Sequence, residues 1–170
     1  DLGAEKFLDT KCRVAGIQPD CVVVVATVRA LKLHGGADKA QLSEENMSAL
    51  RAGLPNLLKH VENIKKVFNK PVVVAMNRFA TDTKAETDEV LTACKKSGAK
   101  AVFTDVFLKG GEGGKELAEA VITACAKKSK LRFAYNLKDG IVKKIEDIVK
   151  SVYGGDGAEF TDTALRKVNE

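Results

Sequence analysis

The chain alternates short apolar runs with longer amphipathic stretches. Residues 21–27 and 71–76 are β-branched runs without alternation, the pattern of strands buried on both faces of a parallel sheet. Residues 99–104 form a third apolar run, and residues 131–135 alternate apolar with polar positions, which predicts a fourth, half-exposed strand. The run at 71–76 stops at Asn77, and we expect the rest of the chain to be scaffold for the loop that begins there.

Apolar residues three and four positions apart predict helices between and after these strands. The predicted helices cover residues 47–68, 84–97, 117–125 and 137–152. Thr83 with Glu86 has the pattern of a capping box at the start of the second helix. Gly53 and Pro55 interrupt the first helix. Because proline is tolerated only in the first turn of a helix, we expect a break or a strong kink near residue 53.

This alternation of strands and helices predicts an α/β fold, in which right-handed βαβ units form a parallel sheet of about four strands with flanking helices. With 170 residues, 45% of them hydrophobic, the chain can form one ordinary domain with a buried core. It begins without methionine and ends inside an amphipathic pattern. We therefore expect it to be a segment of a longer protein.

Charge and cysteine content narrow the classes of partner and compartment. The net charge is +5, and the chain has only two tyrosines and no tryptophan to stack on bases. The lysines lie mostly on predicted helix faces. We therefore expect no nucleic-acid partner and favour an anionic small molecule as the ligand. No apolar run approaches the ~18 residues of a membrane span, and we expect no membrane partner. The four cysteines lack CxxC spacing and nearby histidines, which argues against zinc and disulfides and predicts a reducing, cytoplasmic location.

Three of the predicted strand ends meet at one edge of the sheet, where ligands bind in open α/β folds. They lead into residues 29–36, 77–82 and 105–114, each of which supplies polar groups or glycine backbone. The alternative is that these are the ordinary polar loops of an α/β domain.

Residues 110–116 are glycine-rich but do not form a Walker A phosphate loop. Lys109 stands where that motif requires its first glycine, and Glu116 stands where it requires Ser or Thr. The glycines favour instead a tight strand-to-helix turn and close approach of a ligand. The helix that begins near Gly114 can offer free N–H groups to an anion.

Two polar and two aromatic side chains follow neighbouring strand ends. Asn77 and Asp82 loosely resemble the Asn-x-x-Asp edge by which P-loop nucleotide hydrolases hold a purine base, although the aspartate here lies five positions on. An amide can pair with a base edge through its donor and its acceptor. Phe79 and Phe107 can together clamp a flat heterocycle, and the alternative for Phe79 is a core position.

Cationic side chains cluster after the first strand. Arg29, Lys32 and His34 can neutralise a phosphate or a carboxylate, and His34 is equally expected as a turn residue because two glycines follow it. His60 lies within a helical stretch, and we interpret it as structural. No Ser/His/Asp, Cys/His or metal-ligand arrangement is suggested, so we assign no catalytic residue and no metal site.

Seven motifs occur jointly: DLGAEKF at residues 1–7, KCR at 11–13, VATVRALK at 25–32, HGG at 34–36, NL-x-KH-x-EN at 56–63, N-x-F-x-TDT at 77–83 and KGGEG at 109–113. In this order and spacing the chain resembles formate–tetrahydrofolate ligase (formyltetrahydrofolate synthetase) over essentially its whole length. The resemblance implies an internal segment of a three-layer, P-loop-NTPase-like enzyme whose P-loop half lies outside the segment. It divides the chain into residues 1–70 (C-terminal part of the nucleotide-binding domain), 71–153 (folate and adenine side) and 154–170 (start of a following segment).

The resemblance also implies a reaction and its partners. Formate attacks the terminal phosphate of ATP to give formyl phosphate, and the formyl group then passes to tetrahydrofolate to give 10-formyltetrahydrofolate. Mg²⁺ would be held elsewhere in the full-length enzyme, and a homo-oligomer is a further expectation. Because stabilising the charge of phosphoryl transfer requires the absent phosphate loop, we expect this segment to be inactive when isolated from the remainder of the ligase chain.

Site residues follow from the same resemblance. Phe79, Ala80 and Phe107 would flank the pteridine ring of tetrahydrofolate. The ATP side would comprise Asn77, Asp82, Arg29, Gly35 and Gly36. Family members often have proline at the position of Ala80 and usually tryptophan at that of Phe107, which implies a weaker folate affinity or a re-packed clamp. The alternative functions are a generic nucleotide-binding domain and a non-catalytic doubly wound α/β domain.

Overall fold

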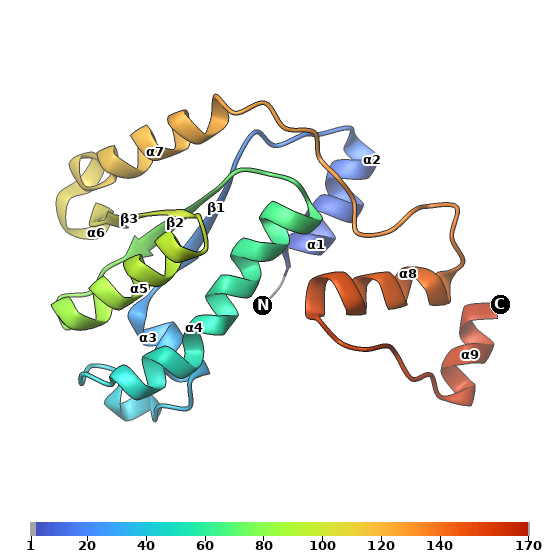
Figure 1. Cartoon of the computed structure of the whole chain (residues 1–170), viewed down its shortest axis with the longest axis horizontal. Helices are drawn as coiled ribbons and strands as arrows, with labels where there is room; N and C mark the ends of the chain where they lie inside the picture. Colours follow the sequence, from blue (N-terminus) through green and yellow to red (C-terminus); the bar gives the residue numbers. More distant parts are fainter. Residues whose placement is uncertain (1–2, 170) are drawn as a thin grey trace.

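The computed structural model describes residues 3–169 and contains a three-stranded parallel sheet (Figure 1). Its strands are β1 (Val22–Ala26), β2 (Val72–Asn77) and β3 (Lys100–Thr104), in the order β1-β2-β3. In this register Val22 lies opposite Val72, and Met76 lies opposite Phe103. The α/β class, the parallel sheet and its first three predicted strands are thus confirmed.

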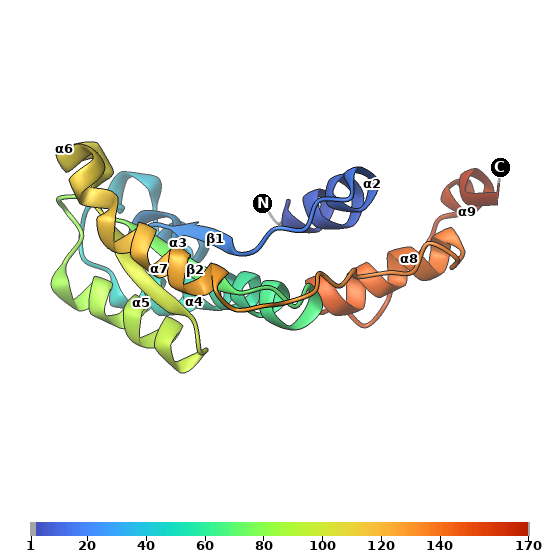
Figure 2. The ribbon, with the colours of Figure 1, turned by 90° about the horizontal axis from the view of Figure 1, so that it is seen from above.

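Helices cover the two faces of the sheet, which gives three layers (Figures 1 and 2). On one face, Val72, Val74 and Met76 join a core formed with α3 (Val28–His34), α4 (Met47–Glu62) and α5 (Lys84–Lys96). On the other face, Val73 packs with Val102 and with Ala124 of α7 (Lys115–Cys125). Strand β2 is therefore buried on both faces, as its unbroken apolar run predicts.

Strand β1 differs from the prediction of full burial. Val22 and Val24 pack against the core, whereas Val25 on the opposite face is 67% exposed. Helix α7 contacts β2 and β3, so the α7 side of β1 remains open. A β-branched run alone cannot distinguish an edge strand from a central one, because both have the same composition.

The predicted fourth strand at residues 131–135 is wrong, since this segment has an irregular conformation. Its backbone N–H groups bond to groups outside any sheet. The Arg132 N–H donates to the Phe68 carbonyl at 3.0 Å, and the Ala134 N–H donates to the Asp9 carboxylate at 2.9 Å. Leu131 is buried while Arg132 and Phe133 are both exposed, so burial in this segment does not follow the alternation of the sequence.

The predicted break near residue 53 is also wrong, because α4 runs without interruption from Met47 to Glu62. Gly53 lies where α4 crosses the end of α3. A Cβ added at Gly53 would come within 1.9 Å of the Leu31 carbonyl oxygen, and one at Gly35 within 1.8 Å of the Ala49 carbonyl oxygen. These glycines therefore allow close helix packing. Pro55 removes one backbone donor on the exposed side of α4.

The remaining helices connect or extend this body. The capping box at the start of α5 is confirmed, with Thr83 as the N-cap. The other elements are α1 (Ala4–Lys6), η1 (Phe7–Cys12), α2 (Arg13–Ala15), η2 (Lys39–Gln41), η3 (Asn63–Val67), α6 (Val106–Lys109), η4 (Gly110–Gly114), α8 (Ile141–Ile148), η5 (Val149–Tyr153) and α9 (Asp162–Asn169). Figure 2 shows α8 and α9 extending away from the sheet. The proposed boundaries at residues 70 and 153 stay a prediction.

Candidate functional site

The carboxyl ends of the three strands meet at one edge of the sheet, as predicted. The Arg78 N–H, just past β2, donates to the carbonyl of Thr104 at the end of β3. The Arg78 guanidinium pairs with Asp105 at 2.6 Å. On the other side, Arg29 of α3, the helix that follows β1, donates to the Thr81 hydroxyl at 3.0 Å. Side-chain contacts therefore connect the loop after β2 to the segments after both neighbouring strands.

Phe79 lies on a tight turn within this loop. The Asp82 carboxylate accepts a hydrogen bond from the Phe79 N–H at 2.9 Å, and the Asp82 N–H donates to the Phe79 carbonyl at 3.0 Å. Burial raises the pKa of Asp82, although the bond from the Phe79 N–H opposes this shift. The Phe79 ring is 38% exposed, and Ala80 beside it is also exposed. Asp82 thus fixes the backbone that presents the ring.

Arg29 covers one face of the Phe79 ring, with its guanidinium carbon 4.4 Å from the ring centroid. Its other contacts are with hydroxyl groups, at 3.0 Å to Thr81 and 3.4 Å to Ser43. Its Nε is buried and has no hydrogen-bond partner in the part of the chain that the structure describes. Within residues 3–169, Arg29 forms no ion pair with a carboxylate. Its guanidinium is therefore not held by a direct ion pair, although its charge is close enough to lower the pKa of the Asp82 carboxyl.

Phe107 lies on α6, the short helix that directly follows β3, and is 96% exposed. The glycine-rich turn after it folds back onto the strand end. The Asp105 N–H donates to the Gly113 carbonyl at 3.1 Å, and a Cβ at Gly113 would come within 2.5 Å of the Asp105 backbone. The glycines do not form the predicted strand-to-helix turn: the chain passes from β3 to α6 at Asp105, and the glycines form η4 between α6 and α7. Phe79 and Phe107 thus follow adjacent strands, and neither ring is sealed in the core.

Lys32 and Gly35 have roles that the sequence did not indicate. Lys32 is 1% exposed and pairs with Glu86 at 2.8 Å, so the prediction that it neutralises a ligand is wrong. Gly35 is in backbone contact with α4, while Gly36 is exposed with a φ of +91°. Asn77, the last residue of β2, is half-buried at the same edge of the sheet.

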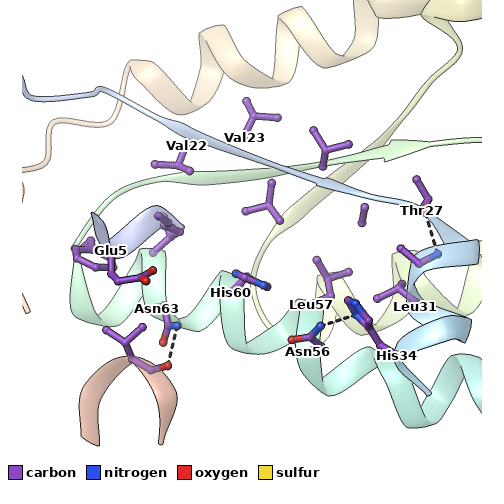
Figure 3. A pocket seen from close by; sticks show the side chains of 18 residues that line it. Glu5, Val22, Val23, Thr27, Leu31, His34, Asn56, Leu57, His60 and Asn63 are labelled. Carbon is purple, nitrogen blue, oxygen red and sulfur yellow. Dashed lines mark hydrogen bonds between the residues drawn. The ribbon is translucent and has the colours of Figure 1, made fainter. Parts of the chain in front are cut away.

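A pocket of about 320 Å³ lies along β1, between this strand and α4 (Figure 3). His34 lies at one end of it, where its Nδ1 is hydrogen-bonded to Asn56. Glu5 and Asn63 lie at the other end; each is buried, with one side-chain oxygen that has no hydrogen-bond partner among residues 3–169. His60 lies between them (Figure 3), and burial lowers its pKa.

Sequence reasoning missed this pocket. Asn63 lies off the apolar stripe of residues 47–68, so helix periodicity gave no signal for it.

Among residues 3–169, no helix is long and apolar enough to cross a membrane. The described residues also contain no cluster of three or more metal-binding side chains. Compared with known protein families, the sequence matches the family described as formate–tetrahydrofolate ligase across residues 1–170.

Proposed function

Because the chain belongs to the formate–tetrahydrofolate ligase family, an ATP-dependent ligase family, we propose that it supplies the folate and adenine side of the active site in a longer ligase. Formate, ATP and tetrahydrofolate are the substrates in this proposal, and formyl phosphate is the intermediate that donates the formyl group. The phosphate loop and Mg²⁺ would be held by the remainder of the enzyme. The family match favours this function over a generic nucleotide-binding or a non-catalytic domain.

Phe79 carries the folate part of the proposal. A core phenylalanine would be buried, yet this ring is 38% exposed on a turn fixed by Asp82 at the carboxyl edge of the sheet. Arg29 occupies one face of the ring, which leaves the other side for a planar pteridine. Aromatic rings favour such offset stacking. Phe107, exposed after the adjacent strand, supplies the second ring of the clamp, and Ala80 lines the space next to Phe79.

The ATP part rests on charge and on hydrogen-bonding capacity. Arg29 supplies a guanidinium that forms no direct ion pair within residues 3–169, and this group binds phosphate oxygens well because its N–H groups form a planar fork. Asn77 supplies an amide at the strand end, where it can pair with adenine. Asp82 contributes mainly through the turn. Gly36 leaves open space near the end of α3, whereas direct binding of ATP by Gly35 stays a prediction, because its backbone contacts α4.

The cellular setting belongs to the same proposal. Cys12, Cys21, Cys94 and Cys125 are free thiols, which supports a reducing, cytoplasmic location. Assembly into a homo-oligomer stays a prediction.

The decisive experiment is the substitution Phe79→Ala in the intact ligase. We expect the KM for tetrahydrofolate to rise about tenfold or more, since base and ring stacking of this kind contributes about 1–3 kcal/mol per ring, while the KM for ATP changes less than about twofold. Steady-state kinetics with each substrate varied in turn will measure both.

Phe133→Ala is the matched control. Phe133 is also 38% exposed and also lies under an arginine, Arg13 at 3.9 Å, but it belongs to the segment between α7 and α8. Its loss should leave both KM values unchanged. Equal rises in the two constants for Phe79→Ala, or no rise in either, would reject the stacking role.

A further inference from the structure

We propose that the buried ion pair between Lys32 and Glu86 positions the turn that carries Phe79, and that both are therefore positioning residues for tetrahydrofolate binding. This inference rests on the proposed function of Phe79. Neither residue is expected to touch a substrate, since Lys32 is 1% exposed and Glu86 is fully buried.

The pair joins segments that are distant in sequence. Lys32 lies on α3 and its Nζ is 2.8 Å from a Glu86 carboxylate oxygen on α5. The same Nζ donates to the Glu44 carbonyl at 2.7 Å. Glu86 in turn accepts the Asn46 N–H at 3.0 Å, and Asn46 is the N-cap of α4. One pair of opposite charges thus connects α3, the loop before α4, and α5.

Glu86 also fixes the start of α5, directly after the Phe79 turn. Its second carboxylate oxygen accepts the Thr83 N–H at 3.2 Å, and the Thr83 hydroxyl accepts the Glu86 N–H in return. Thr83 follows Asp82, which closes the turn around Phe79. Movement of the Glu86 carboxylate would therefore be transmitted to Phe79 through only a few residues.

Helix α3 holds the same turn at a second place. Arg29, one helical turn before Lys32, lies over the Phe79 ring and donates to Thr81. The turn is thus attached to α3 at the ring by Arg29 and at its far end by Lys32 through Glu86. Figure 1 shows α3 beside the start of α4 and below the carboxyl edge of the sheet.

The capping box alone does not require Lys32, because glutamate at this helix position is sufficient to cap its own backbone. A buried ion pair contributes little net stability over an apolar pair of similar volume, and its best-supported benefit is to specify one arrangement. Two charges withdrawn from water at this place are thus explained better by geometry than by stability.

The test uses Glu86→Gln in the intact ligase. Glutamine keeps the size of the side chain, and its one carbonyl oxygen can still accept the Thr83 N–H. Its NH2 group then faces Lys32 and the Asn46 N–H, so Lys32 loses its counter-ion and Asn46 loses its acceptor. We expect the KM for tetrahydrofolate to rise at least about fivefold, because small displacements of a positioning group have large kinetic effects, and the KM for ATP to change less than about twofold. Hydrogen exchange of the backbone amides at residues 79–83 should become faster.

Glu89→Gln is the matched control. Glu89 lies one turn further along α5 and pairs with Arg51 of α4 at 3.1 Å, but in this pair Arg51 is exposed and Glu89 is only half-buried. It should change neither KM value nor the exchange at residues 79–83.

The double variant Lys32→Met/Glu86→Gln separates positioning from stability. It leaves no unpaired buried charge, so the melting temperature should recover relative to Glu86→Gln, while the raised KM for tetrahydrofolate remains. If the melting temperature and the KM for tetrahydrofolate both return to the values of the unmodified enzyme, then Glu86 serves only to neutralise the buried Lys32 charge, and the proposal is overturned. If Glu86→Gln does not fold, the double variant is compared directly with the unmodified enzyme, and an unchanged KM for tetrahydrofolate overturns the proposal.

Comparison with Phe79→Ala distinguishes the two ideas. If Phe79→Ala raises the KM for tetrahydrofolate and the Glu86 variants do not, the positioning role is wrong and the function of Phe79 stands. If Glu86→Gln speeds amide exchange at residues 79–83 but Phe79→Ala has no effect on that KM, the proposed function of Phe79 is rejected and the positioning role for folate is rejected with it.

Discussion

Two arginine–phenylalanine stacks, Arg13 on Phe133 and Arg29 on Phe79, are alike in geometry and unlike in charge. The guanidinium carbon lies 3.9 Å from the ring centroid in the first stack and 4.4 Å in the second. Both rings are 38% exposed. The first stack joins the N-terminal helices to the segment after α7, whereas the second lies at the carboxyl edge of the sheet.

The hydrogen-bond partners of the two guanidinium groups differ. Arg13 bonds to the Asp9 carboxylate at 3.2 Å, the Asp9 carbonyl at 2.9 Å and the Tyr135 carbonyl at 2.8 Å. Within residues 3–169, the Arg29 guanidinium donates hydrogen bonds to two hydroxyl groups, and its Nε is buried without a hydrogen-bond partner. The same pair of residue types is therefore structural in one place and open to a ligand in the other. Whether such an arginine is structural or can bind a ligand is therefore indicated by the charges around it and not by the aromatic ring that it covers.

The largest expected effect is on stability, from Arg13→Met. This change leaves the Asp9 carboxylate, which is 3% exposed, without its positive partner. Breaking a buried pair by removing one member costs about 3 kcal/mol. Unfolding of the intact protein by denaturant should show this loss, with both KM values unchanged. A loss below about 1 kcal/mol would show that Arg13 is not the structural member of the comparison.

The stability of the Arg13→Met variant should depend on pH in a way that tests the role of Asp9. Burial raises the pKa of Asp9, and the Ala134 N–H and Arg13 oppose the rise. Without Arg13 the folded-state pKa should rise further. A raised carboxyl pKa favours the folded state fully below the unfolded pKa, and this benefit is lost as the pH rises through the folded pKa.

The deficit of Arg13→Met relative to the unmodified protein should therefore be small in acid and grow toward neutral pH. Melting temperatures from about pH 4 to pH 7 will measure this. Adding Asp9→Asn, which keeps an acceptor for the Ala134 N–H, should remove most of the pH dependence. A deficit that is constant over this range would contradict the assignment to Asp9.

The smallest expected change in stability is from Arg29→Met. Since no carboxylate within residues 3–169 pairs with Arg29, the free energy of unfolding should change by less than about 1 kcal/mol. The KM for ATP should rise about tenfold, which corresponds to one charge-assisted hydrogen bond. Arg29→Lys keeps the charge but not the planar fork, and should show an intermediate KM. A variant as unstable as Arg13→Met, with normal KM values, would reverse the comparison.

Those parts of the fold that depend on local chemistry could be predicted from the sequence. The buried strand β2 and the capping box of Thr83 and Glu86 are examples, because an unbroken apolar run and a four-residue motif each determine their own structure. The segment 131–135 could not be predicted, since its backbone N–H groups bond to Asp9 and Phe68. A sequence pattern does not reveal such distant partners.

The site was predictable to the same limited extent. Parallel topology brings three strand ends to one edge, and this rule is sufficient to predict that Asn77, Phe79 and Phe107 lie along the same edge. Arg29 and Lys32 lie three residues apart on one helix, and the sequence could not predict that Arg29 lies over the Phe79 ring while Lys32 is buried in an ion pair. Burial and a counter-charge distinguish them, and Glu86 is distant in sequence.

The contact between Gly35 and Gly53 has a consequence for any attempt to redesign this protein. Each glycine occupies a space in which even a methyl group would collide with the carbonyl of the opposite helix. Enlarging either residue would force α3 away from α4, and α3 carries both Arg29 and Lys32. Two residues without side chains thus set how closely α3 approaches α4, and we expect a larger residue at either position to shift Arg29 relative to the Phe79 turn without touching a substrate itself.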